Sequence, residues 1–228
     1  MQQEKIWAYF QAGGDSGDVF AQARPRYEFL SERTRRGEHV LNIGVGRGGL
    51  EALLLAKGVK VSCLDPGMQA IEALREKHQL GERAQTGYSQ AMPFPDAEFD
   101  VVVMSEVLEH LEDEVLARTL IEVRRVLKPE GHFIGTVPAD ENLQAEQVMC
   151  PHCGQLFHRW GHLQSFDEGR LRKLLSGGFQ DVSVSRHYFG DRAGLNLKGR
   201  LGWAIKKGLV LLGVKGGGET YFFSARRS

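Results

Sequence analysis

The stretch from residue 39 to residue 65 limits the possible folds more than any other part of the chain. Its pattern predicts a buried strand, a turn that contains four glycines, a helix and a second strand that ends on Asp65. In parallel α/β sheets this arrangement forms a nucleotide site, because glycines let the backbone approach the ligand and a carboxylate there can accept two ribose hydroxyls. Gly44, Gly46 and Gly49 also satisfy the dinucleotide pattern G-x-G-x-x-G, so this stretch alone suits NAD equally well.

The composition is that of an ordinary soluble globular protein, with 42% hydrophobic and 25% charged residues in a chain of 228. The 29 basic and 29 acidic residues cancel, so no global field favours nucleic acid and no nucleic-acid partner is expected. The first residues lack the apolar core of a signal peptide, and no apolar run is long enough to span a membrane. Three cysteines, an odd number, argue against a disulfide framework. These observations together predict a cytoplasmic protein.

Strand and helix patterns alternate from residue 39 onward, which predicts a doubly wound α/β fold with a parallel sheet. We expect one domain over residues 1–228, with residues 1–30 as an N-terminal cap. The expected strands cover residues 39–45, 59–65, 83–87, 99–104, 132–137, 182–187 and 220–225. The expected helices of the first half cover residues 50–57, 68–80 and 113–127.

The alternation breaks twice in the second half of the chain. Residues 140–165 have no clear period, and we interpret them as an insertion that is rich in cysteine and histidine. Ser165-Phe-Asp-Glu168 then resembles a capping box at the start of a further helix. Residues 190–218 are rich in glycine, basic and apolar residues, and we interpret them as a second insertion before the last strand.

Five motifs in order make the chain similar to the class I S-adenosylmethionine-dependent methyltransferases over about residues 38–138. The family's glycine-rich motif, acidic motif, adenine-side loop, fourth-strand exit and fifth-strand turn are matched in that order. The matching segments are Val40-Leu-Asn-Ile-Gly-Val-Gly-Arg-Gly48, Leu64-Asp-Pro-Gly-Met68, Gly87-Tyr-Ser-Gln-Ala-Met-Pro-Phe94, Phe99 to His110, and Val126-Leu-Lys-Pro-Glu-Gly131. The resemblance implies a Rossmann-like sheet of about seven strands, the last of them antiparallel.

The resemblance also implies S-adenosylmethionine as the cofactor and assigns residues to it. Asp65 would hold the ribose, while Gly44, Gly46 and Gly48 would pass close to the methionine half. The remaining residues that the resemblance places at the cofactor are Asn42, Pro66, Met68, Ser89, Gln90, Ala91, Met92, Ser105 and Glu106. Asn42 stands where the family often has an acid, but its carbonyl oxygen can still accept a hydrogen bond. Tyr88 replaces an acid that is frequent in the adenine-side loop.

His110 is the candidate catalytic residue, because this strand exit faces the acceptor side in the family. Methyl transfer mainly requires alignment of the acceptor with an already activated sulfonium. A base is needed only when a hydroxyl or amine must lose its proton, and histidine titrates near neutral pH. The alternative is that His110 only packs against the following helix.

A possible metal site lies in the first insertion, where Cys150, Cys153, His158 and His162 have the spacing C-x2-C-x4-H-x3-H. Two cysteines in one tight turn and two histidines can complete a tetrahedral zinc site, which with four protein ligands would be structural. The C-x2-C-G-x3-H portion resembles a zinc knuckle, and His152 competes as the fourth ligand. The alternative is a free thiol pair beside unrelated histidines. Cys63, by contrast, belongs to a predicted core strand.

The second insertion holds six basic side chains interleaved with apolar residues between residues 191 and 215. They are Arg192, Lys198, Arg200, Lys206, Lys207 and Lys215, with Asp191 as the only acid. A basic amphipathic helix can lie on an anionic membrane, which would place the protein at the inner membrane face. The alternative is a helix whose apolar face packs on the domain, because the frequent glycines weaken a free-standing helix.

These observations predict a methyltransferase that acts, at oxygen, on a small-molecule, glycan or lipid-linked acceptor. One alternative is a nucleic-acid or protein methylase that grips a macromolecule with the cysteine- and histidine-rich insertion. Neutral net charge and the lack of an Asn-Pro-Pro-Tyr-type motif after the fourth strand count against base methylation. Another alternative is a catalytically inactive, zinc-stabilised partner subunit.

Overall fold

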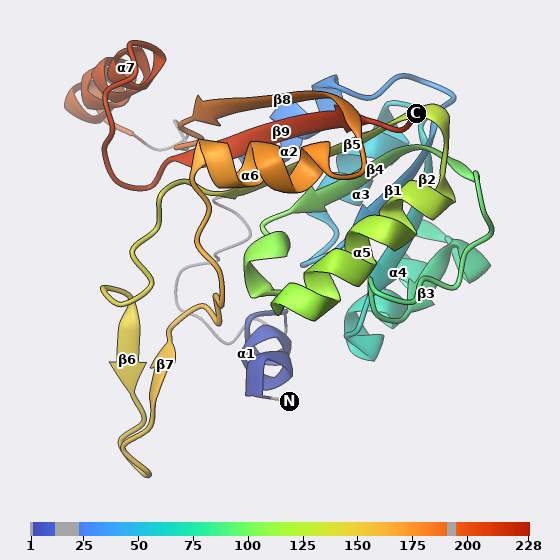
Figure 1. Ribbon diagram of the computed structural model, residues 1–228, viewed down its shortest axis with the longest axis horizontal. Helices are drawn as coiled ribbons and strands as arrows, with labels where there is room; N and C mark the ends of the chain where they lie inside the picture. Colours follow the sequence, from blue (N-terminus) through green and yellow to red (C-terminus); the bar gives the residue numbers. More distant parts are fainter. Residues whose placement is uncertain (1, 12–22, 191–194) are drawn as a thin grey trace.

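The computed structural model describes residues 2–11, 23–190 and 195–228. A seven-stranded mixed sheet forms its centre, with helices on both faces (Figure 1). The strand order across the sheet is β3 (Ala84–Thr86), β2 (Lys60–Asp65), β1 (His39–Ile43), β4 (Phe99–Ser105), β5 (Leu127–Pro138), β9 (Thr220–Arg226) and β8 (Gln180–His187). β9 runs antiparallel to both of its neighbours, and the first five strands are parallel. The doubly wound sheet with an antiparallel last strand is therefore confirmed.

The two faces of the sheet are covered by different sets of helices. One hydrophobic core joins the sheet to α2 (Arg24–Glu32), α3 (Gly49–Ala56) and α4 (Met68–His78). The other joins it to α5 (Asp113–Val126) and α6 (Glu168–Ser176), which lie in front of the sheet in Figure 1. Val40 belongs to the first core and Leu41 to the second, as the alternation of side chains along a strand requires. Both faces of β1 are thus buried, which explains its uninterrupted apolar sequence.

The register of β1, β2 and β4 brings the ends of these three strands side by side. Ile43 at the end of β1 is opposite Leu64 of β2 and Met104 of β4. The residues that follow these three are Gly44, Asp65 and Ser105, and they therefore lie together at one edge of the sheet. In open α/β folds this edge, at the carboxyl ends of the strands, is where ligands bind.

The predicted capping box before α6 is wrong. The Asp167 side chain, not Ser165, accepts the hydrogen bond from the Arg170 N–H at 2.7 Å and caps the helix. The Ser165 hydroxyl instead donates to the Glu141 carbonyl at 2.7 Å. Ser165 thus ties the chain entering α6 to the segment that follows β5.

Three elements extend the fold beyond the sheet and its covering helices. α1 (Gln2–Gln11) lies near the N-terminus, and α7 (Leu197–Leu211) is inserted between β8 and β9 in the chain. The first insertion forms an antiparallel hairpin of β6 (Gln147–Met149) and β7 (Leu156–His158), which reaches away from the sheet (Figure 1). Two short 3-10 helices are η1 (Gly81–Arg83) and η2 (Leu108–His110). Among the described residues, no helix is both long and apolar enough to cross a membrane.

Candidate active site

The turn after β1 contains glycines in a left-handed backbone conformation that other residues rarely adopt. Gly44, Gly46 and Gly48 have φ values of 83°, 52° and 76°. A Cβ on Gly44 would lie 2.5 Å from the Val107 side chain, and one on Gly48 would lie 2.3 Å from that of Leu74. The turn therefore presents bare backbone beside the end of β4, as close approach to a ligand requires.

Asp65 at the end of β2 is buried, with its carboxylate held by the backbone around it. It accepts hydrogen bonds from the N–H of Val45 at 3.0 Å and of Gly67 at 2.7 Å. Burial raises the pKa of Asp65, and these two N–H groups act against that rise. The carboxylate is thus fixed directly beside the glycine turn, where it can accept further hydroxyl donors.

In this structure the side-chain amide of Gln11, at the end of α1, is a donor to the Asp65 carboxylate. Its amide nitrogen lies 3.3 and 3.4 Å from the two carboxylate oxygens of Asp65. Arg47 of the glycine turn also donates to the Phe10 carbonyl at 2.9 Å. α1 therefore sits over the predicted ribose position, with an amide where two hydroxyls would bind. Sequence reasoning missed Gln11, because no local pattern links it to Asp65.

Asn42 is buried on the α3 face of the sheet rather than open to solvent. Its amide donates to Glu51 of α3 at 2.7 Å, and its Oδ1 atom has no hydrogen-bond partner among the described residues. Burial raises the pKa of Glu51 to about 7. The Cys63 thiol contacts the same carboxyl at 3.6 Å, and burial raises the pKa of that thiol. Cys63 is a core residue, as predicted.

The predicted adenine-side residues divide into anchored and exposed ones. The Ser89 hydroxyl is hydrogen-bonded to Thr119 of α5 at 2.8 Å, and the Met92 N–H donates to Glu122 at 2.7 Å. Ser89 can therefore offer a ligand its backbone more readily than its hydroxyl. The exposed or half-buried members of the set are Pro66, Met68, Gln90 and Ala91. Met68, at the first position of α4, is 60% exposed and free to lie against a planar ring.

The end of β4 brings Ser105 and Glu106 together with Arg26 of α2. Arg26 donates to the Ser105 hydroxyl at 2.9 Å, and its Nη1 atom lies 3.9 Å from Glu106. Glu106 has a φ of 56°, a conformation that costs energy for a residue with a side chain and that occurs often at functional sites. Arg26 was not predicted, since its distance of 79 residues from Ser105 leaves no sequence signal.

His110, at the end of η2, is buried between α1 and the segment after β7. Its ring meets Trp7 edge-on with centroids 4.6 Å apart, and its Nδ1 atom lies 3.1 Å from the Gly161 carbonyl. Burial, and then the neighbouring His162, lower the pKa of His110 to about 3. The ring is therefore neutral near pH 7 and a weak base.

The four predicted zinc ligands are not brought together in the part of the chain that the structure describes. Cys150 and Cys153 lie at the tip of the β6–β7 hairpin, where the N–H groups of Cys153 and His152 lower the pKa of the Cys150 thiol. His158 and His162 lie at its base, with their rings stacked 4.6 Å apart. Among the described residues, the groups of three or more potential ligands are Glu109, His110, His162 and Glu141, His158, His162. Neither group contains a cysteine.

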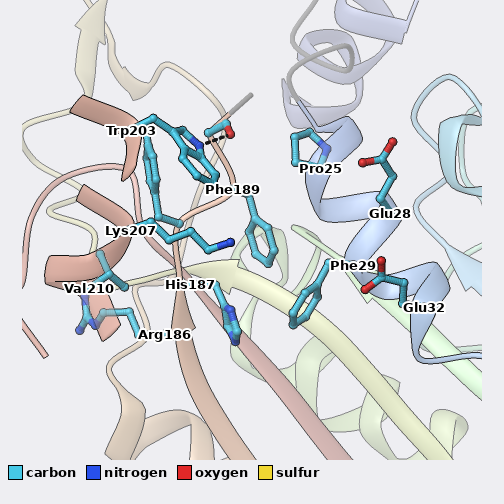
Figure 2. Close-up of a pocket in the computed structure, with 12 residues that line it drawn as sticks. Pro25, Glu28, Phe29, Glu32, Arg186, His187, Phe189, Trp203, Lys207 and Val210 are labelled. Carbon is cyan, nitrogen blue, oxygen red and sulfur yellow. Dashed lines mark hydrogen bonds between the residues drawn. The ribbon is translucent and has the colours of Figure 1, made fainter. Parts of the chain in front are cut away.

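A cavity of about 380 Å³ lies between α2, the end of β8 and α7 (Figure 2). Phe29 is part of its lining and packs directly against His187 and Phe189, with ring centroids 4.6 and 5.1 Å apart. Trp203 of α7 closes one side and donates to the Gly190 carbonyl at 2.6 Å. The lining includes none of the predicted cofactor residues. This cavity is therefore separate from the site at the glycine turn.

Known proteins that are similar to this chain include methyltransferases, in agreement with a cofactor site at the carboxyl edge of the sheet. Residues 41–135 match the family model of a methyltransferase domain. The chain is 34% identical over 118 residues to the demethylmenaquinone methyltransferase of Symbiobacterium thermophilum, covering 47% of this chain and 45% of that protein. It is 33% identical over 191 residues to a probable S-adenosylmethionine-dependent methyltransferase of Mycobacterium tuberculosis, covering 83% of this chain and 65% of that protein. The chain thus spans about half to two thirds of the length of these relatives.

A solved structure shares the fold over the whole chain. It is the Burkholderia thailandensis 1,6-didemethyltoxoflavin-N1-methyltransferase with bound 1,6-didemethyltoxoflavin and S-adenosylhomocysteine, with a TM-score of 0.66 and 21% sequence identity. The match covers 100% of this chain and 87% of that one. The matched residues 41–135 contain the glycine turn, Asp65 and the end of β4. The chain is therefore similar to S-adenosylmethionine-dependent methyltransferases, and its residues 41–135 match a methyltransferase domain.

Proposed function

We propose that this protein transfers the methyl group of S-adenosylmethionine to an oxygen of a small-molecule, glycan or lipid-linked acceptor. The observation that carries the proposal is Asp65, a buried carboxylate held by two backbone N–H groups beside a turn of left-handed glycines. Gln11 already places an amide donor on both of its oxygens, as the two ribose hydroxyls of the cofactor would. The bound cofactor would supply an activated methyl group, and the protein would supply alignment and a dry site.

Aromatic side chains of α1 cover the region around His110, where the proposal places the acceptor. Trp7 lies against His110, and Phe10 lies against Trp160 with ring centroids 5.3 Å apart. The first contact joins α1 to η2, and the second joins α1 to the segment after β7. Exclusion of water from this region would strengthen the electrostatic interactions that orient the acceptor. The role of His110 as general base stays a prediction; because the ring is a weak base, activation of an acceptor hydroxyl needs a further group.

A small-molecule acceptor is supported over a macromolecular one by two observations. Two of the three proteins named above are named for demethylmenaquinone and 1,6-didemethyltoxoflavin, which are neither nucleic acids nor proteins. The net charge of zero offers no general attraction to a nucleic acid. Incubation of the protein with methyl-labelled cofactor and fractionated cell extract tests this. We expect label in the small-molecule or lipid fraction, and label confined to RNA or protein would contradict the proposal.

Helix α7 supports an acceptor that is lipid-linked and reached at a membrane surface. Leu197, Leu201, Ile205 and Leu209 recur every four residues, and all are exposed. Val210, by contrast, is buried against the cavity beside α2. The apolar stripe thus faces away from the domain, contrary to a helix that buries its apolar face on the sheet. Lys198 and Arg200 are exposed on the same helix and complement anionic head groups; Arg192 and Asp191 lie outside the described residues.

Vesicle binding tests this placement directly. The wild-type protein is expected to co-sediment with vesicles that contain anionic lipid more strongly than with purely zwitterionic ones. The double substitution L201E/I205E should abolish that binding, because it places two charges in the stripe. I121E, which alters a 68% exposed isoleucine on α5, is the matched control and should bind like wild type. Equal binding by L201E/I205E would contradict a membrane role for α7.

A further inference from the structure

Two glutamates and three histidines meet where η2 and the base of the β6–β7 hairpin come together, although the sequence scatters them over 54 residues. Glu109 and His110 come from η2, Glu141 follows β5, and His158 and His162 flank the end of the β6–β7 hairpin. In each of the two groups that these residues form, the potential ligand atoms lie within 4.8 Å of one another. The hydrogen bonds of the histidines decide which group can bind a metal ion.

In both His110 and His162 the Nδ1 atom of the ring has a hydrogen-bond partner, and the Nε2 atom is the candidate metal ligand. The His110 Nδ1 atom lies 3.1 Å from the Gly161 carbonyl, which can only accept, so Nδ1 carries the proton. The His162 Nδ1 atom lies 2.5 Å from a carboxylate oxygen of Glu141. In both rings the lone pair is therefore left on Nε2. Metal-ligating histidines are held in this way by a carbonyl or a carboxylate on the far nitrogen.

His158 has the opposite arrangement. Its Nδ1 atom accepts from the N–H groups of Trp160 at 3.3 Å and of His162 at 3.1 Å. The proton of the neutral ring must then be on Nε2, which lies 3.6 Å from Glu141. His158 therefore supports Glu141 instead of offering a ligand atom. Glu141, facing His158 and His162, is engaged in orienting these two rings.

Unlike Glu141, the Glu109 carboxylate does not form a hydrogen bond to a histidine ring in the described part of the chain. The residue is fully buried, and neither of its oxygens has a hydrogen-bond partner among the described residues. Its Oε1 atom lies 4.0 Å from the His110 Nε2 atom, on the side where that ring has its lone pair. A buried carboxylate without hydrogen bonds is costly, and a bound cation offsets that cost.

We propose that Glu109, His110 and His162 bind one divalent transition-metal ion, with Glu141 as the carboxylate that orients His162. Two histidines and one carboxylate form a site with an open position, as in catalytic zinc sites. Trp7 of α1 packs on His110, so the metal site lies beside α1. An acceptor oxygen bound there would lose its proton more easily. This last role rests on the proposed function, whereas the metal site does not.

Zinc titration by equilibrium dialysis, with metal analysis, separates this site from the Cys2His2 site that the sequence predicts. We expect the wild-type protein to bind about one equivalent of zinc. E141Q should weaken binding about 10–100-fold, as second-shell changes do, and E109Q and H162Q should weaken it more. C150S/C153S and H132Q, which alters an exposed histidine of β5, should bind like wild type. Absence of saturable binding, or its loss in C150S/C153S, would overturn the proposal.

Cobalt(II) gives a readout that does not depend on whether a variant folds. The wild-type cobalt protein should show visible bands of nitrogen and oxygen ligation without thiolate charge-transfer absorption, and such absorption would overturn the site. S-adenosylhomocysteine binding, measured in parallel by calorimetry, keeps the two proposals apart. Metal binding without cofactor binding would contradict only the proposed function. Cofactor binding without metal binding would contradict only the metal site.

Discussion

Asp65 organises the candidate site at the residue scale before any ligand is present. Its carboxylate accepts from the N–H of Val45, after β1, and from that of Gly67, after β2, and the Gln11 amide also donates to it. The sequence predicted Asp65 and the glycines because their chemistry is fixed by local pattern. Gln11 and Arg26 could not be predicted, because their contacts depend on how distant helices pack.

Gln11 is expected to compete with the cofactor for Asp65. Q11A should therefore bind S-adenosylhomocysteine about 2–10-fold more tightly than wild type, the value of one ordinary hydrogen bond. D65N should bind it about 10–100-fold more weakly, because hydrogen bonds to a charged acceptor are worth more. Calorimetry on both variants gives these values. Weaker binding by Q11A would show that α1 helps to hold the ligand instead of excluding it.

Glu51 should make the stability of the fold depend on pH. The folded protein keeps this proton up to a pKa of about 7, whereas the unfolded chain releases it near the usual 4.5. The free energy of unfolding should thus fall by up to about 3 kcal/mol as pH rises between these values. The free energy of unfolding of E51Q, measured with urea, should not show this fall. Its difference from that of wild type should therefore shift by about 2–3 kcal/mol in favour of E51Q as pH rises from about 5 to about 8. E76Q, at an exposed site of α4, should show no such gain.

At the scale of elements, β5 shows how tightly the centre of the sheet is packed. A Cβ on Gly135 would lie 2.1 Å from the Met104 carbonyl and 2.5 Å from the Phe223 ring. The β6–β7 hairpin shows the opposite extreme, with strands of three residues each. So short a hairpin leaves no periodicity to read, which is why residues 140–165 appeared unpatterned. The partner of His162 is Glu141, not Cys150, because the hairpin separates its tip from its base.

G135A should destabilise the protein by about 3 kcal/mol, because the added methyl group meets backbone that cannot move away. For a chain of this size that corresponds to a fall of about 6–12 °C in Tm. G178A is the control, since a Cβ there meets nothing within 4 Å. Thermal unfolding of the two variants should separate them clearly, and equal Tm values would mean that β5 is less tightly packed than described.

The whole molecule combines a predictable centre with additions that sequence reasoning could only outline. The doubly wound sheet was predicted from the alternation of strand and helix patterns, and the antiparallel last strand from the motif resemblance. The order of the strands across the sheet was not predicted. The orientation of α7 was left open, because its apolar stripe could face either the domain or the solvent; the structure exposes Leu197, Leu201 and Ile205. How α1, the β6–β7 hairpin and α7 are placed around the sheet is a property of tertiary packing alone.

Calorimetric titration of the protein with S-adenosylhomocysteine tests the central claim most directly. The glycine turn that first suited NAD equally well should bind S-adenosylhomocysteine at one site and should not bind NAD. D65A should remove that binding and should also lower Tm, because the N–H groups of Val45 and Gly67 lose their acceptor. Saturable binding of NAD, or no binding of S-adenosylhomocysteine by the wild-type protein, would contradict the account.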